Sequence, residues 1–208
     1  MFAEAELGND FRISYVLGNQ GEDTLSGIHV LEDADVALIS VHRRPLPEAH
    51  MKALKDFVSS GKPMIGFRTA SHAFSLRSEE PPAGLTTWED FDATVWGGNY
   101  HGHHGNELKT FAWSVDGAAN HPILNGIAAG EFATGGSLYE VLPLAAGAEV
   151  LVMGRAEGQD VHQPVAWTFT RGDSGRSFYT SLGHVNDFAT PQFKTLLENA
   201  IHWAVDGK

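Results

Sequence analysis

The first third of the chain alternates short apolar runs with a segment of helical periodicity. Residues 35–41 (DVALISV) and 63–67 (PMIGF) are nearly continuous apolar runs, a pattern typical of strands buried on both faces. Between them, Met51, Leu54 and Phe57 recur at a spacing of three residues, and a glycine follows. This spacing predicts an amphipathic helix with a glycine at its end.

The order of these segments indicates the fold class. Residues 11–17 (FRISYVL) predict a strand ahead of them, and residues 71–76 predict a short helix after them. An order of strand, strand, helix, strand, helix is typical of an α/β protein with a parallel sheet. The rest of the chain predicts strands at 111–115, 148–156, 164–170 and 176–183, the last two joined as a hairpin, and a final helix from Thr190 and Pro191.

Composition and charge narrow the classes of protein. The 208 residues are 42% hydrophobic and 19% charged, which predicts one globular domain over residues 1–208. The net charge of −12 argues against binding to nucleic acid or to anionic membranes. The sequence has no cysteine, which excludes disulfides, thiolate metal sites and a cysteine nucleophile. It shows neither a membrane-spanning run nor a signal peptide, so we expect a cytoplasmic location for the chain as given.

Histidine and arginine follow the predicted strands. Ligands of open parallel sheets bind beyond the carboxyl ends of the strands. An arginine at the turn from a strand into a helix cannot act as a nucleophile, but it can bind an anion or a hydroxyl group. The candidates selected in this way are Arg43 after 35–41, Arg68, Thr69 and His72 after 63–67, and His184 after 176–183.

A glycine-rich loop, residues 96–107 (WGGNYHGHHGNE), contains three further histidines. In one interpretation it is a metal site, in which His101 and His103 share a face of an extended backbone and His104 points away. A third imidazole, from His184 or His72, would complete a zinc or manganese site. The candidate metal ligands within the loop are His101, His103 and His104.

Two other interpretations of the loop need no metal. In the second, Tyr100, His103 and His184 bind sugar hydroxyl groups and transfer protons around Arg68. In the third, the histidines are structural and form local hydrogen bonds or pack against tryptophan. The residue pattern leaves all three interpretations open.

Several segments together resemble the ThuA-like (trehalose utilisation) family, from about Phe11 to the C-terminus. They are GKPMIGFRTASHAF, GGNYHGHH, HPILNG, SLYE, PVAWTF, GRSFYTSLGHVNDF and PQFKTLLENAIHWA. The resemblance implies a class I glutamine amidotransferase-like fold, which is a flavodoxin-like three-layer α/β sandwich around a mostly parallel sheet. Members of the family usually begin with a strand, whereas this chain opens in FAEAEL, which resembles the first helix. We therefore expect the first strand to be missing, with either an altered sheet or a partner chain, as in a homo-oligomer, at the gap.

The resemblance also bears on activity. It aligns Arg68 with the catalytic cysteine of amidotransferases and His184 with their histidine, while Val185 and Asn186 replace the residues that complete the triad. It therefore implies that the chain does not hydrolyse glutamine, and it points towards sugar metabolism.

The sequence thus predicts a carbohydrate-processing enzyme that acts on a keto-sugar or a glycoside by proton transfer, with a divalent metal as an option. Arg68 would hold an oxyanion, and His103 and His184 would act as acid and base. The predicted substrate-binding residues are His72, Tyr100, Tyr139, Arg43 and Thr69. The alternative is a non-catalytic module that binds a carbohydrate or a small anion in the same cleft.

Overall fold

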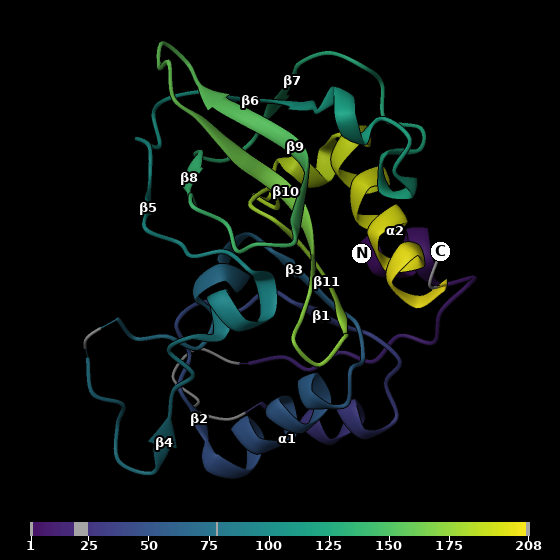
Figure 1. The fold of residues 1–208 in the computed structure, drawn as a ribbon. Helices are drawn as coiled ribbons and strands as arrows, with labels where there is room; N and C mark the ends of the chain where they lie inside the picture. Colours follow the sequence, from purple (N-terminus) through teal and green to yellow (C-terminus); the bar gives the residue numbers. More distant parts are fainter. Residues whose placement is uncertain (1, 19–24, 78, 207–208) are drawn as a thin grey trace.

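The computed structural model describes residues 2–18, 25–77 and 79–206 (Figure 1). The two α-helices are α1 (Glu48–Ser59) and α2 (Pro191–Asp206). The strands are β1 (Ala37–Ile39), β2 (Leu46–Pro47), β3 (Met64–Phe67), β4 (Leu85–Thr86), β5 (Gly102–His103), β6 (Thr110–Ser114), β7 (Phe132–Thr134), β8 (Tyr139–Glu140), β9 (Ala148–Ala156), β10 (His162–Thr170) and β11 (Arg176–Thr180). Seven short helical turns, at Ala3–Leu7, Ile28–Glu32, Arg68–His72, Asp92–Trp96, Asp116–Ala118, Pro122–Leu124 and Asp187–Ala189, complete the described elements.

The main sheet is mixed. Its seven strands run in the order β1-β3-β11-β10-β9-β6-β7. The pairs β1–β3 and β3–β11 are parallel, whereas the four pairs from β11 to β7 are antiparallel. The predicted mostly parallel sheet is therefore not confirmed, although the α/β class is. The reason is local, because β9, β10 and β11 are joined by short turns, and a short turn reverses the chain direction.

Helices cover both faces of this curled sheet (Figure 1). On one face, Phe193, Leu197 and Ile201 of α2 belong to a hydrophobic core with Ile65 and Phe178 of the sheet. This agrees with the apolar periodicity of the last helix.

The opposite face carries the second core. Met51, Leu54 and Phe57 of α1 pack there with Met64 of β3 and with Trp96. The predictions of the two long helices, α1 and α2, are thus confirmed, together with their buried faces. No helix among the described residues is long and apolar enough to cross a membrane.

Several predictions near the start of the chain are wrong. Residues 11–17 form no strand. β1 lies at an edge of the sheet and is not buried on both faces, since Leu38 is 45% exposed. The short helix predicted at 71–76 lies instead at Arg68–His72, directly after β3. The apolar run of β1 thus reflects burial of one face only.

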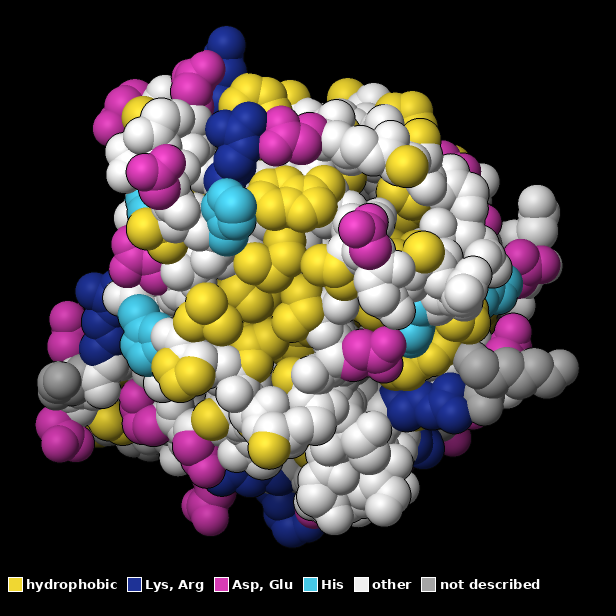
Figure 2. Space-filling model, turned by 45° about the horizontal axis from the view of Figure 1, so that its top comes forward, with side chains coloured by type: hydrophobic (Ala, Val, Ile, Leu, Met, Phe, Trp, Pro, Cys, Tyr) yellow, Lys and Arg dark blue, Asp and Glu magenta, His cyan; other side chains and the backbone are white. Residues whose placement is uncertain are grey.

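One face of the molecule carries a broad apolar area with histidine side chains at its border (Figure 2). Large apolar areas of this kind mark binding surfaces more often than single exposed residues do. Among the exposed apolar residues of the protein are Leu142 and Val161, which are 47% and 48% exposed. Both residues also line a cavity together with His101 and His104 of the glycine-rich loop 96–107, which we call the histidine loop.

Candidate functional site

Arg68 lies at the sharp turn that the sequence predicts between a strand and a helix. It follows β3 directly and has a φ of +49°, a conformation that side-chain-bearing residues seldom adopt. Its guanidinium is already hydrogen-bonded, because Nη1 donates to the carbonyl oxygens of Ser137 (2.9 Å) and Ser181 (3.0 Å). Nη2 donates to Oγ of Ser137 (3.0 Å). These bonds occupy N–H donors that an oxyanion would need. They also connect the end of β3 to two segments that lie far along the chain.

A row of aromatic rings and imidazoles extends from Arg68 across the carboxyl ends of β1 and β3. The guanidinium lies 4.2 Å from the ring centroid of Tyr139. Tyr139 lies 4.7 Å from Tyr100, and Tyr100 lies 4.4 Å from His72, measured between centroids. We call His42, His72, Tyr100, His103 and Tyr139 the strand-end cluster. The cluster therefore combines residues from four separate segments, and the rule that ligands bind beyond strand ends (the strand-end rule) predicted only part of it.

The cluster contains a hydrogen-bonded tyrosine–histidine pair. The phenol oxygen of Tyr100 lies 2.8 Å from Nδ1 of His103. His103 is on β5 and pairs with Tyr139 of β8, so the short β5–β8 ribbon holds its ring next to both tyrosines. His103 is exposed, which leaves its other ring nitrogen open to a ligand.

His72 is one of two buried members of the strand-end cluster, the other being Tyr139. Its ring packs against His42 at 5.2 Å, and its Nδ1 lies 3.0 Å from Oγ of Ser71. Burial, followed by the positive charge of Arg43, lowers the pKa of His72 to about 3. His72 is therefore neutral at physiological pH and suits hydrogen bonding to a sugar better than proton uptake.

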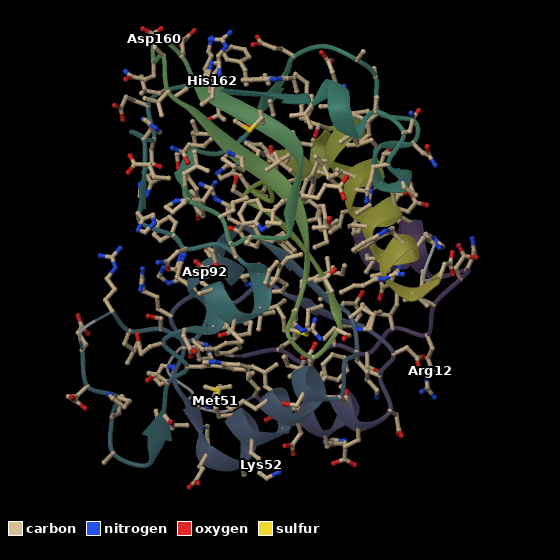
Figure 3. All side chains as sticks on the ribbon, in the orientation of Figure 1. Arg12, Met51, Lys52, Asp92, Asp160 and His162 are labelled. Atoms are coloured by element: carbon tan, nitrogen blue, oxygen red, sulfur yellow. The ribbon has the colours of Figure 1, made fainter. Side chains whose placement is uncertain are left out.

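Asp92 is a buried carboxyl group that the sequence pattern does not single out. It begins the short helix Asp92–Trp96 and is 7% exposed (Figure 3). Its Oδ2 accepts a hydrogen bond of 2.6 Å from the backbone N–H of Tyr100, and its Oδ1 has no partner among the described residues. Burial outweighs this hydrogen bond and raises the pKa of Asp92 to about 7. The only signal in the sequence is an aspartate within the largely apolar segment 91–96.

His184 lies in a neighbouring loop that a buried carboxylate organises. Asp187 is 2% exposed and accepts hydrogen bonds from the backbone N–H groups of Gly135 (2.6 Å), Gly183 (2.8 Å) and His184 (2.9 Å). A Cβ on Gly135 would lie 3.0 Å from Nδ1 of His184, and one on Gly136 would lie 2.9 Å from the guanidinium of Arg68. His184 and Arg68 thus contact adjacent residues of one segment.

His101 and His104 lie apart from His103. They line a cavity of about 430 Å³ together with Glu140, Leu142, Val161 and Gln163. The expectation that His101 and His103 share a face while His104 points away does not describe this arrangement. Nε2 of His104 is buried without a hydrogen bond and lies 4.0 Å from Oε1 of Glu140. In the described part of the chain, no group of three histidine or carboxylate side chains is arranged to hold a metal ion.

The remaining candidates lie beside the strand-end cluster. The backbone N–H of Arg43 donates to the carbonyl oxygen of His72 (3.1 Å), and its Nη1 donates to that of Ser75 (3.2 Å). Thr69 follows Arg68 in the short helix after β3 and is half-buried. Arg43 thus borders the buried histidine directly.

The bonds of Arg68 lead to a first prediction. Replacing Arg68 by lysine should lower the free energy of unfolding by about 1–3 kcal/mol, because one ammonium group cannot span the three acceptors that the guanidinium reaches. Urea unfolding measures the effect, and Arg12→Lys at an exposed position is the matched control. If the two variants were equally stable, the connecting role of Arg68 would be wrong.

The fold and the strand-end cluster define an α/β protein with a ring-lined site at one end of a mixed sheet. The chain matches the trehalose utilisation (ThuA) family over residues 4–204 and belongs to that family. This confirms the resemblance found in the sequence, and the family description connects the chain with carbohydrates. A comparison with curated proteins finds no match.

Solved structures support the same assignment of the fold. A ThuA-like protein of Parabacteroides merdae is 17% identical, with a TM-score of 0.73, and the match covers 100% of this chain and 84% of that one. A ThuA-like protein of Bacteroides uniformis is also 17% identical, with a TM-score of 0.71 and coverage of 98% and 81%. A cytoplasmic protein of Salmonella typhimurium is 13% identical, with a TM-score of 0.57 and coverage of 98% and 85%. At these identities the comparison bears on the fold alone.

Proposed function

We propose that the protein is a carbohydrate-active enzyme that transfers a proton next to the carbonyl group of a keto-sugar. The observation that carries the proposal is the 2.8 Å contact between the phenol oxygen of Tyr100 and Nδ1 of His103 at the carboxyl ends of the parallel strands. A histidine whose far nitrogen is open and whose near nitrogen is held is suited to general acid–base chemistry. Membership of the trehalose utilisation family supports a sugar as the substrate.

The roles of the residues follow from their positions. With Nδ1–H of His103 donating to the phenol oxygen of Tyr100, Nε2 is the base that accepts the proton. The phenol oxygen then stabilises the imidazolium that forms. Burial raises the pKa of the Tyr100 phenol, which keeps it neutral and able to hydrogen-bond. The half-buried Tyr100 and the exposed His103 provide the surface against which a sugar would lie, with His72 and Tyr139 buried behind them.

His184 keeps its predicted role in the proposal as the second acid–base group. Support comes from its loop, which contacts Gly135, one residue from the position that faces Arg68. The test therefore treats His103 and His184 separately. Zinc or manganese at His101, His103 and His104 stays a prediction.

The test is the exchange of a carbon-bound proton in D₂O. Wild-type protein should catalyse incorporation of deuterium next to the carbonyl group of a keto-glucoside, followed by proton NMR. His103→Ala should lower the exchange rate by about 10²-fold or more, and Tyr100→Phe by a smaller factor, because the base is lost in the first variant and only oriented less well in the second.

The controls separate catalysis from binding and folding. His29→Ala removes an exposed histidine from the short helix Ile28–Glu32 and should leave the rate unchanged. If wild-type protein binds the keto-glucoside without accelerating exchange, the protein is a carbohydrate-binding module and the catalytic proposal is wrong. If His184→Ala keeps the wild-type rate, His184 has no part in the step.

A further inference from the structure

Arginines gather around the strand-end cluster although the protein as a whole is strongly acidic. The chain has 26 acidic and 14 basic residues. Arg43 borders His72 through its backbone and lies on the same loop as His42. Arg77 is exposed, and its backbone N–H donates to Oγ of Ser75 (3.2 Å), the residue whose carbonyl oxygen accepts a hydrogen bond from Nη1 of Arg43. A local excess of positive charge on a protein of net charge −12 opposes the overall field.

The backbone at these arginines is unusual. In the part of the chain that the structure describes, four residues other than glycine have a positive φ, and three of them are Arg43 (+43°), Arg68 (+49°) and Arg77 (+63°). Such conformations cost free energy and persist where the surrounding structure requires them. Residues with such conformations cluster at functional sites, and their concentration here indicates that the strand-end cluster is one.

The positive charges of these arginines act on the same two side chains, His72 and Tyr100. Arg43, Arg77 and Arg68 all lower the pKa of His72, and the same three lower that of the Tyr100 phenol against the larger effect of burial. Acidic groups are also near, since Glu79 and Glu89 act on Arg43 and Glu140 acts on Tyr100. Glu89 is itself engaged, because it accepts hydrogen bonds from Ser75 and Leu76. The arginines therefore extend their field over the surface where a sugar would lie.

We propose that the strand-end cluster takes a carbohydrate that carries an anionic group, either a carboxylate or a phosphate, and that Arg43 and Arg77 bind this group. Arg68 is held by Ser137 and Ser181 and shapes the site without reaching the ligand. Guanidinium groups bind both kinds of anion through paired N–H donors. The inference rests on the proposed function only for the position of the sugar ring.

The test compares three probes of similar size, glucose, glucuronate and glucose 6-phosphate, by isothermal titration calorimetry. At least one anionic probe should bind about tenfold more tightly than glucose, which is the range expected for a charge-assisted hydrogen bond. A preference for glucuronate identifies the anionic group as a carboxylate, and one for glucose 6-phosphate identifies it as a phosphate. The preference should decrease as NaCl is raised.

Three variants complete the experiment. Arg43→Gln and Arg77→Gln should each remove most of the preference, whereas Arg12→Gln, at an exposed position away from Asp92 and the cluster, should keep it (Figure 3). Equal binding of all three probes, an undiminished preference in Arg43→Gln and Arg77→Gln, or no binding of any probe would each overturn the inference. If the protein catalyses deuterium exchange in a neutral keto-glucoside but shows no preference for anionic probes, this inference alone is wrong. If it prefers anionic probes but catalyses no exchange in any keto-sugar, the proposed reaction alone is wrong.

Discussion

Replacing Asp187 by alanine is expected to lower the free energy of unfolding by about 3–5 kcal/mol. The carboxylate is almost fully buried and accepts three backbone hydrogen bonds, so its loss leaves the N–H groups of Gly135, Gly183 and His184 without a partner. These donors are partly buried, so each one left unpaired costs about 1–2 kcal/mol. Because domains are commonly stable by only about 5–15 kcal/mol, this variant should show a clear loss of stability in urea.

Asp187→Asn provides the graded comparison. Its single carbonyl oxygen can replace Oδ2, which serves Gly183 and His184, while its NH₂ group would face the N–H of Gly135. We therefore expect a smaller loss than for alanine. Asp116→Asn, at an exposed position, is the control. A loss below about 1 kcal/mol in Asp187→Ala would show that the loops do not depend on this carboxylate.

The second large effect concerns Asp92, whose replacement by asparagine should stabilise the protein above neutral pH. The pKa of Asp92 is raised from 3.8 to about 7, so between these pH values the folded protein holds a proton that the unfolded chain releases. The free energy of unfolding therefore falls as the pH rises through this range and levels off above pH 7. Asparagine stays neutral, so Asp92→Asn should be more stable than wild type by up to about 4 kcal/mol at pH 8.

The measurement is urea unfolding of both proteins at pH 4 and at pH 8. The two should differ little at pH 4, because this pH is close to the unfolded pKa of 3.8 and the unfolded chain has released the proton only in part. They should diverge at pH 8. Asparagine also keeps a carbonyl oxygen to accept the N–H of Tyr100, so the histidine loop should stay in place. Identical pH dependence in the two proteins would contradict the raised pKa of Asp92.

Periodic elements were the most predictable part of the fold. α1, α2 and the β10–β11 hairpin each contain enough apolar repeats or turn residues to identify them from one sequence. Strand direction was less predictable, because an apolar run indicates how a strand is buried, and burial only correlates with whether its neighbour runs parallel or antiparallel. Residues 11–17 had the composition of a strand, but no strand forms there.

The structure brings several of the predicted residues close together, but their contacts were less predictable. The strand-end rule selected Arg43, Arg68 and His72, and the histidine loop supplied Tyr100 and His103. The hydrogen bonds of Arg68 to Ser137 and Ser181 could not be predicted, because they join segments far apart in the sequence. The divergence of His101 and His104 from His103 depends on β5 and β8, which have two residues each and carry no periodic signal.

The long-range bonds of Arg68 also determine when the site can form. Its two carbonyl acceptors lie 69 and 113 residues further along the chain. During synthesis from the N-terminus, Arg68 at the sharp turn after β3 must therefore leave the ribosome long before Ser181, its second acceptor, has been added to the chain. The site is then expected to form only after Ser181 has emerged, so a ribosome stalled before this residue should carry a nascent chain without the bond of Arg68 to Ser181.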